Sequence, residues 1–221
     1  MSCADGVLLV DKPSGMTSHD VVDAIRRRFF KKKVGHAGTL DPFATGLLVI
    51  LLGSFTKKSI QFSGYDKEYE AVLKLGVATD TCDIEGKILE EKEINDVTKE
   101  KIEKAFGEFS GEIQQIPPMF SAKKIKGKKL YELARKGIEL TREPKTVWIR
   151  KIEIRDFSVP LVSFYVKCSK GTYIRQLADD IGKRLKCGAH LVSLKRTAVG
   201  PFELAKSVAL NDAKNEDILQ P

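Results

Sequence analysis

The sequence predicts an α+β fold with a central sheet that is mixed and mainly antiparallel. Two observations carry this prediction. Segments with the period-two alternation of strands are interspersed irregularly with segments of helical periodicity, and hairpin-like strand pairs outnumber βαβ units. The 221 residues contain no repeat, low-complexity segment or clear linker. We therefore expect one compact domain over residues 1–221, which is long enough to bury a core without disulfides.

Local patterns predict the elements of the N-terminal half in order. They indicate a strand at 7–10, a helix that begins at Thr17 or Ser18, a buried strand at 47–52, a short helix at 54–62, a strand at 69–75 and an amphipathic helix that begins at Thr98. The first of these helices ends in six cations between Arg26 and Lys33. Cations there suit the helix dipole, and they form a basic edge before residues 35–46.

The C-terminal half is predicted in the same way. Residues 116–118, Ile-Pro-Pro, are expected to break the helix that begins at Thr98. Five lysines follow within residues 121–129. We then expect a short helix at 130–136, strands at 148–154 and 161–168, a helix with an apolar stripe from Ile174 to Leu185, and a final strand and turn at 190–202.

Composition narrows the classes of partner and compartment. The net charge is +8 and the pI is near 9.2, which indicates an anionic partner, most commonly nucleic acid. A merely basic protein without such a partner is the simpler alternative.

The cysteines are widely spaced and form no CxxC pair, and the longest apolar run, 47–52, is too short to span a bilayer. No signal peptide is recognisable, so we expect a cytoplasmic protein.

Several kinds of catalytic chemistry lack their sequence motifs. There is no phosphate-binding loop of the Walker type, no dinucleotide GxGxxG, no HExxH and no GxSxG. The three histidines do not have metal-ligand spacing. We therefore expect neither a metal nor a cofactor. An aspartate can still act as a nucleophile without a metal, provided that a nearby cation keeps it ionised in a dry pocket.

Residues 35–46 contain the strongest candidate for such an aspartate. Asp41 is the only carboxylate in a run of glycines, small residues and His36. Gly35, Gly38 and Gly46 allow sharp turns or positive φ, and Pro42 restricts Asp41 to extended or turn geometry. The segment is suited to presenting a carboxylate, and equally to an Asx-type turn that joins two elements.

Six segments in order along the chain resemble the motifs of the TruB-type tRNA pseudouridine synthases. They are residues 11–18, 35–46, 67–69 with 79–83, 115–122 with 134–137, 171–175 and 188–191. The resemblance runs almost from end to end of the chain. It implies a pseudouridine synthase-like fold with a catalytic cleft, and isomerisation of uridine 55 in the T arm of tRNA without a cofactor. The implied partner is the T stem-loop, bound by a monomer.

The resemblance also implies roles for individual residues. Asp41 is the nucleophile, Arg175 pairs with it, and Tyr69 stacks on the flipped base, where its hydroxyl helps to remove the C5 proton. The remaining residues bind the substrate: Tyr173 and Leu194 line the uridine pocket, and His36 contacts the RNA. We leave Lys12 outside the catalytic set, because the Lys-Pro turn also suits a structural role in buttressing the tyrosine strand.

Each of these residues has a simpler interpretation. Tyr69 fits an ordinary strand aromatic, Arg175 a surface residue in the first turn of a helix, and Leu194 a core residue. Only residues 204–221 follow the last turn, so we expect no separate C-terminal RNA-binding domain. The alternative function is a non-catalytic RNA-binding or RNA-folding protein. A carboxylate glycosidase ranks far below, because it needs two carboxyl groups and residues 35–46 supply one.

Overall fold

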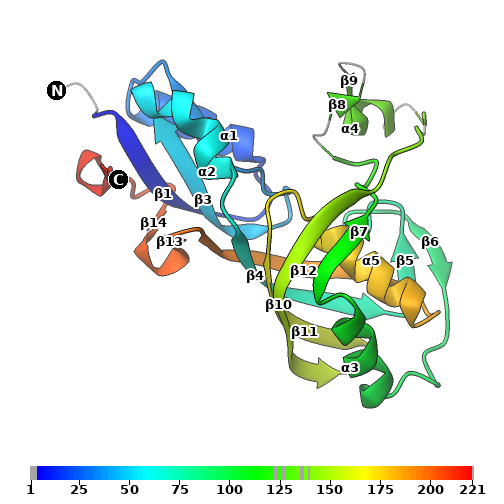
Figure 1. Cartoon of the computed structure of the whole chain (residues 1–221). Helices are drawn as coiled ribbons and strands as arrows, with labels where there is room; N and C mark the ends of the chain where they lie inside the picture. Colours follow the sequence, from blue (N-terminus) through cyan, green and yellow to red (C-terminus); the bar gives the residue numbers. More distant parts are fainter. Residues whose placement is uncertain (1–3, 122–123, 126–127, 135–136, 139, 221) are drawn as a thin grey trace. The chain divides into compact units, whose positions relative to one another are not determined.

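The computed structural model describes residues 4–121, 124–125, 128–134, 137–138 and 140–220, which fall into two compact units (Figure 1). The first unit is Met1–Glu70 with Ser193–Pro221, and the second is Ala71–Val192. Strand pairing is mixed and mainly antiparallel, and helices accompany the strands in both units. The α+β prediction is therefore confirmed.

The first unit is built on a short mixed sheet. Its strands run in the order β14, β1, β3, β12, with β2 paired to β3 and β13 paired to β12. β1 and β3 are antiparallel, whereas β3 pairs in parallel with β12 and β1 in parallel with β14. The elements are β1 (Gly6–Lys12), α1 (Ser18–Arg28), β2 (Val34–His36), β3 (Thr45–Leu52), η1 (Gly53–Lys58), α2 (Ser59–Ser63), the start of β4 (Lys67–Leu75), the end of β12 (Ala189–Val199), β13 (Phe202–Glu203), η2 (Leu204–Lys206), β14 (Val208–Ala209) and η3 (Asn215–Asp217).

Both faces of this sheet are covered by apolar side chains. Leu8, Leu48 and Ile50 pack with α1 on one face, while Val7 and Leu47 belong to a second apolar cluster on the other face. A strand buried on both faces is apolar at successive positions, which explains the continuous run in β3. The strands that carry the candidate loop therefore form a rigid base for it.

Helix α1 begins where its capping residues predict. Thr17 is the N-cap: its side chain accepts a hydrogen bond from the Asp20 backbone N–H, and the Asp20 carboxylate accepts one from the Thr17 backbone N–H. This capping box satisfies two donors at the helix start. Val21 and Ile25 are buried, so α1 is held by its own cap and by the core.

The second unit combines a sheet with two longer helices. β4, β11, β10 and β7 follow one another in the sheet, and β10 is antiparallel to both β11 and β7. Phe106 of α3 packs edge-on against Phe164 of β11, with ring centroids 5.3 Å apart. The elements are most of β4, β5 (Val77–Thr79), β6 (Ile88–Glu91), α3 (Lys99–Glu108), β7 (Gly111–Gln115), β8 (Lys124–Ile125), β9 (Lys128–Lys129), α4 (Leu130–Ala134), β10 (Lys145–Ser158), β11 (Leu161–Cys168), α5 (Ile174–Arg184) and the start of β12.

The structure corrects one prediction for residues of the second unit and leaves part of another outside the described residues. Residues 116–118 do not end a helix, because α3 stops at Glu108 and β7 lies between. Gly111, with φ 89°, turns the chain out of the helix and into that strand. The predicted helix at 130–136 is observed as Leu130–Ala134, and residues 135–136 lie outside the described residues, as do four positions of the lysine-rich segment, 122–123 and 126–127. None of the described helices is long and apolar enough to cross a membrane.

Candidate active site

Asp41 lies at the first position of a tight turn between β2 and β3. The backbone N–H of Ala44 donates to the carbonyl of Asp41 over 3.1 Å, and Pro42 holds the second position, where proline favours such turns. The Asp41 side chain is half-buried. The turn expected from the Asp-Pro dipeptide is therefore present, and its first residue is the candidate nucleophile.

The glycines around this turn differ in their roles. Gly38 and Gly46 have φ of 114° and 97°, as the sequence suggested. Gly35 does not, because it lies within β2 as an ordinary strand residue. At Gly46 a Cβ atom would lie 2.4 Å from the backbone oxygen of Arg196, its partner in the parallel β3–β12 pair. Gly46 is thus required by the close approach of the two strands as well as by its φ.

Lys12 fastens the turn from one side. Its side chain is fully buried, and its ammonium group donates to the carbonyls of Met16, Pro13 and Pro42 over 2.6, 2.9 and 3.1 Å. Pro42 also accepts from the backbone N–H of Gly15 over 2.9 Å. A buried ammonium is tolerated because several carbonyl dipoles surround it. Lys12 therefore ties the 11–16 turn directly to the residue that follows Asp41, and its role in buttressing the tyrosine strand stays a prediction.

Arg196 fastens the same loop from β12. Only 1% of this residue is exposed. Its Nε donates to the carbonyl of Leu47 over 2.8 Å, its Nη2 to Gly38 over 3.0 Å, and its Nη1 to Thr39 over 3.3 Å. The planar guanidinium thus spans the two ends of the Asp41 loop, a geometry that an ammonium group cannot reproduce.

Lys67 is a third buried cation near this loop. Its ammonium donates to the carbonyls of Ser63 and Tyr65, both over 2.6 Å. A Cβ atom on Gly38 would lie 3.7 Å from the Lys67 Cε and equally far from the Arg196 Nη1. Tyr69 lies two residues further along β4, on the same face as Lys67, and is 7% exposed. The candidate base-stacking tyrosine therefore extends from a strand whose start is anchored beside the loop.

His36 lies at the end of β2, just before the loop. Its Nδ1 is buried and has no hydrogen-bond partner among the described residues. Burial, and then the charge of Arg196, lower the pKa of His36 below its ordinary value of 6.5. The imidazole is therefore neutral at pH 7 and carries an unsatisfied nitrogen, which suits a contact to a polar ligand.

Arg175 belongs to the second unit, where it is buried. Its Nη1 lies 3.3 Å from the Asp83 carboxylate and donates to the carbonyl of Thr81 over 2.9 Å, while its Nη2 donates to the carbonyl of Phe120 over 2.9 Å. Asp83 is itself held by the Thr81 hydroxyl over 2.6 Å. Arg175 is thus not the surface residue of the simpler interpretation, but a guanidinium fixed by a carboxylate and two carbonyls.

Tyr173 is positioned through its backbone. The side chain of Gln115, which is 1% exposed, accepts from the Tyr173 N–H over 2.8 Å and donates to its carbonyl over 3.0 Å. This paired contact joins the end of β7 to the start of α5. It fixes the backbone that carries Tyr173 and, two residues later, Arg175.

The structure describes the predicted site residues in two groups. Asp41, His36, Tyr69 and Leu194 belong to the first unit, and Tyr173 and Arg175 to the second. Leu194 is buried in β12, consistent with its simpler interpretation as core. The pairing of Asp41 with Arg175 joins the two groups and stays a prediction.

Sequence reasoning missed the residues that hold the two groups in place. The sequence motifs include Lys12, Lys67, Asp83 and Gln115 but assign them no catalytic or binding role, and Arg196 lies outside the motifs. Lys12 and Arg196 share one signal, a polar side chain inside or at the end of an apolar strand pattern. Such a side chain is buried only if it finds partners, and those partners are distant in sequence.

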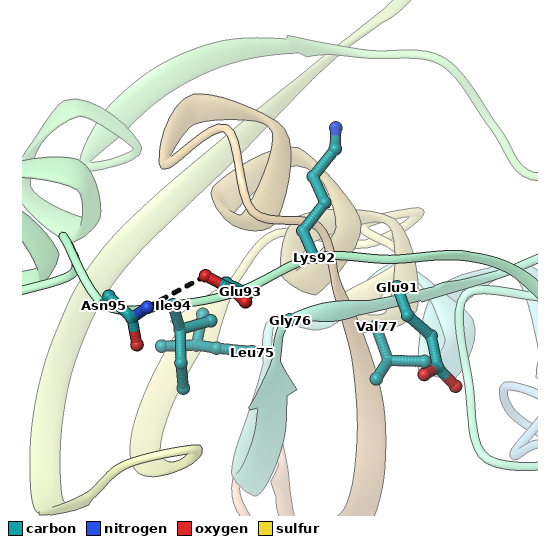
Figure 2. A pocket seen from close by; sticks show the side chains of 8 residues that line it. All are labelled: Leu75, Gly76, Val77, Glu91, Lys92, Glu93, Ile94 and Asn95. Carbon is teal, nitrogen blue, oxygen red and sulfur yellow. Dashed lines mark hydrogen bonds between the residues drawn. The ribbon is translucent and has the colours of Figure 1, made fainter.

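A hollow that the structure describes in the second unit lies elsewhere. Leu75, Gly76, Val77 and residues 91–95 line a volume of about 480 Å³ in the second unit, where Asn95 points toward Glu93 (Figure 2). It contains none of the predicted site residues, and its charges are of both signs. Within the described part of the chain no three His, Cys, Asp or Glu side chains are grouped so that they could hold a metal ion.

Comparison with family models defines the class of protein. The model described as "TruB family pseudouridylate synthase (N terminal domain)" matches residues 26–174, and the model described as "tRNA pseudouridylate synthase B C-terminal domain" matches residues 175–219. The class is thus that of the pseudouridylate synthases. The two matches together include Asp41, Tyr69, Arg175 and Arg196.

Curated relatives agree with the family models. "tRNA pseudouridine synthase B" of Dechloromonas aromatica is 54% identical over 96% of this chain and 71% of its own length. The protein of the same name from Opitutus terrae is 47% identical over 94% of this chain and 86% of its own length. The chain belongs to the TruB family of pseudouridylate synthases, which are isomerases that act on RNA.

Solved structures show the same relationship. A chain of a Cbf5-Nop10-Gar1 complex matches with a TM-score of 0.74 and 33% identity over 94% of this chain. A chain of an H/ACA ribonucleoprotein bound to a substrate RNA containing 2′-deoxyuridine matches with a TM-score of 0.69 and 31% identity. This chain spans about half the length of those chains, 53% and 51%.

Proposed function

We propose that the protein converts uridine to pseudouridine in tRNA, at uridine 55 in the T arm. The observation that carries this proposal is the Asp41 turn, a half-buried carboxylate on a loop fastened by the buried cations Lys12 and Arg196. The names of the curated relatives support tRNA as the substrate. A fixed loop suits a nucleophile, because a misplacement of about 1 Å can cost about 100-fold in rate.

The reaction is an isomerisation, so no oxidant or cofactor enters its balance. Asp41 attacks either C6 of the base or C1′ of the sugar, and the C1′–N1 bond breaks. The freed base rotates, C1′ bonds to C5, and the C5 proton is released while N1 gains a proton. The Asp41 carboxylate is regenerated when its bond to the nucleoside breaks. The chain is therefore required to supply one nucleophile, a group that keeps it charged and a surface that holds the turning base.

Arg175 and Tyr69 complete this chemistry in the proposal. Arg175 is a rigid cation, held by Asp83 and two carbonyls, and pairs with Asp41 to favour its charged form. Tyr69 stacks on the flipped base, and its hydroxyl assists loss of the C5 proton. Tyr173 and Leu194 line the uridine pocket, and these residues together form the catalytic cleft.

His36 and the basic surface engage the rest of the RNA. The target base has to leave its stack before reaction, at a cost of a few kcal/mol. The neutral His36, with its unpartnered Nδ1, contacts the RNA and helps to displace the base. Cations between Arg26 and Lys33 bind phosphates of the tRNA. The single domain over residues 1–221, without a separate C-terminal RNA-binding domain, the monomeric state and the cytoplasmic location stay predictions.

The proposal is tested with a T-arm stem-loop tritiated at C5 of the target uridine. The wild-type protein should release tritium with single turnover complete within minutes at excess enzyme. Absence of release under conditions where the stem-loop is bound would sink the proposal. A second stem-loop has uridine 55 replaced by another nucleotide and carries the tritium label at a different uridine. Release from this stem-loop would contradict the assignment of uridine 55 as the target.

The role of Asp41 is tested by Asp41→Asn in the same assay. This variant removes the charge but keeps the shape, so release should stop while the dissociation constant changes by less than about threefold. Asp212→Asn, an exposed carboxylate of the same unit, is the matched control and should react normally. Normal turnover by Asp41→Asn would show that the nucleophile is another group, and unchanged function in every assay would favour a non-catalytic RNA-binding protein.

A further inference from the structure

Helix α1 ends in an unusual residue for its backbone geometry. Phe30 has φ of 49°, in the left-handed region, directly after the C-cap Phe29. The Phe30 N–H donates to the carbonyl of Arg27 over 3.3 Å, and the Lys31 N–H donates to that of Arg26 over 3.1 Å. These two bonds define a Schellman motif, in which the position of Phe30 is normally glycine or asparagine.

Burial of the Phe30 side chain does not offset the cost of its left-handed backbone. The left-handed region is unfavourable for a bulky side chain, and Phe30 is 95% exposed, so its ring gains almost no burial. Glycine at the same position would relieve the backbone and remove an exposed aromatic ring. Phe30 thus carries a backbone cost without any gain from burial, which a ligand that covers its ring would explain.

The surroundings of Phe30 are strongly basic. Lys31, the residue after Phe30, lines a hollow of about 360 Å³ together with Asp5, Lys32, Lys33, Gly53, Ser54 and Lys57. The one acid, Asp5, already binds the Lys31 ammonium over 2.8 Å and the Ser54 N–H over 2.8 Å. Lys32, Lys33 and Lys57 are exposed. An aromatic ring beside several exposed cations matches nucleic acid, in which bases stack and phosphates carry the charge.

The position of Phe30 separates it from the Asp41 turn. The Ser18 side chain donates to the carbonyl of Leu40 over 3.1 Å and accepts from its N–H over 2.8 Å, so α1 starts beside the turn. Phe30 lies twelve residues further along, which at 1.5 Å per residue is about 18 Å. One nucleotide cannot occupy both places, so the base at Phe30 is not the target uridine.

We propose that Phe30 is a stacking platform for an unpaired base of the substrate tRNA other than the target uridine, with Lys32, Lys33 and Lys57 binding the adjacent phosphates. The proposal rests on the proposed function for the identity of the RNA. It adds a second point of contact, which orients the whole tRNA on the first unit without taking part in the chemistry.

The decisive comparison is Phe30→Gly against Phe30→Tyr, with dissociation constants measured by fluorescence anisotropy for whole tRNA and for the T-arm stem-loop. Loss of one stacked base corresponds to about 5- to 150-fold in affinity, so we expect Phe30→Gly to weaken binding of whole tRNA about tenfold. Phe30→Tyr should bind within about twofold of wild type. Leu89→Ala, which removes an exposed apolar residue of the second unit, is the control and should bind normally.

Two readouts separate stacking from a general structural role. Phe30→Gly should raise the melting temperature by about 2–4 °C, because glycine relieves the left-handed backbone. The slope of log affinity against log salt should stay unchanged in Phe30→Gly, whereas it should fall by about one in Lys57→Gln. A lowered melting temperature in Phe30→Gly would overturn the strain argument.

Failure of this inference and failure of the proposed function give different results. Tritium release from the T-arm stem-loop should be the same for Phe30→Gly and wild type. Weakening of whole tRNA and stem-loop alike by Phe30→Gly would place the stacked base in the T arm, and weakening of whole tRNA alone would place it in another part of the tRNA. Unchanged affinity for whole tRNA would overturn the proposal and would leave the surface to a partner of another kind. Absence of tritium release by wild type would reject the proposed function, while the binding comparison would still decide the role of Phe30.

Discussion

Replacement of Arg196 by lysine tests how the Asp41 loop is held. The substitution keeps the positive charge in β12 but removes the planar fork, whose three N–H groups donate to the carbonyls of Leu47, Gly38 and Thr39. An ammonium group is a point charge on a flexible stem and can keep about one of these bonds. The other carbonyls then lose their donor, and the loop gains freedom beside Asp41.

The magnitude follows from the bonds that are lost. A hydrogen bond to a charged group contributes about 1.5–3 kcal/mol, so the loss of two bonds costs about 3–6 kcal/mol. The 3.3 Å bond from Nη1 to Thr39 is the weakest of the three, which favours the lower end, about 3 kcal/mol. The free energy of unfolding of a domain is typically about 5–15 kcal/mol, so Arg196→Lys should still fold at 25 °C but with a clearly lower free energy of unfolding.

Urea unfolding measures the loss of stability, and single-turnover tritium release measures how far the Asp41 loop has lost its position. We expect the free energy of unfolding to fall by about 3 kcal/mol, and release by the folded variant to slow by about 100-fold if the loop moves by about 1 Å. Arg155→Lys, in an exposed ion pair, should change either quantity little. A stability loss below about 1 kcal/mol together with wild-type release would refute the conclusion that Arg196 positions the loop.

Further predictions concern the other buried groups. Asp83→Asn leaves the Arg175 guanidinium without its buried carboxylate and should cost about 3–5 kcal/mol in urea unfolding; a loss below about 1 kcal/mol would contradict the pairing. Since the pKa of His36 is lowered in the folded state, its contribution to stability is complete above pH 6.5 and is lost as the pH falls through the folded pKa. His36→Gln should remove that part of the pH dependence, and an NMR titration at or above pH 6.5 would contradict the lowered pKa. Burial raises the pKa of Cys82 to about 12, so iodoacetamide at pH 8 should modify Cys82 in urea but not in the native protein.

The local part of the candidate site was predictable from the sequence. Asp41 and Pro42 lie in the turn that an Asp-Pro dipeptide favours, and Gly38 and Gly46 have the positive φ that glycine allows. The same holds for the N-cap Thr17 and for the alternating strands, because caps, turns and periodicity depend on neighbouring residues.

The fastening of the loop was not predictable. Arg196 donates to carbonyls 149 to 158 residues earlier in the chain, and Lys12 reaches across 30 residues to Pro42. The sequence alone predicts that a lysine or arginine in a strand is exposed, because the carbonyl groups that can bind it when buried become known only from the tertiary fold. β7 was missed for a related reason, because its polar sequence Gly-Glu-Ile-Gln-Gln becomes a strand only through pairing with β10.

A crystal structure with a T-arm stem-loop that carries 5-fluorouridine at the target position tests the central claim most directly. The account predicts that the Asp41 carboxylate is bonded to the target nucleoside or lies within about 3–3.5 Å of its C6 or C1′. It further predicts that Tyr69 is stacked on the base and that the Arg175 guanidinium is paired with Asp41. A flipped uridine whose nearest carboxylate is a residue other than Asp41 would contradict the assignment of the nucleophile.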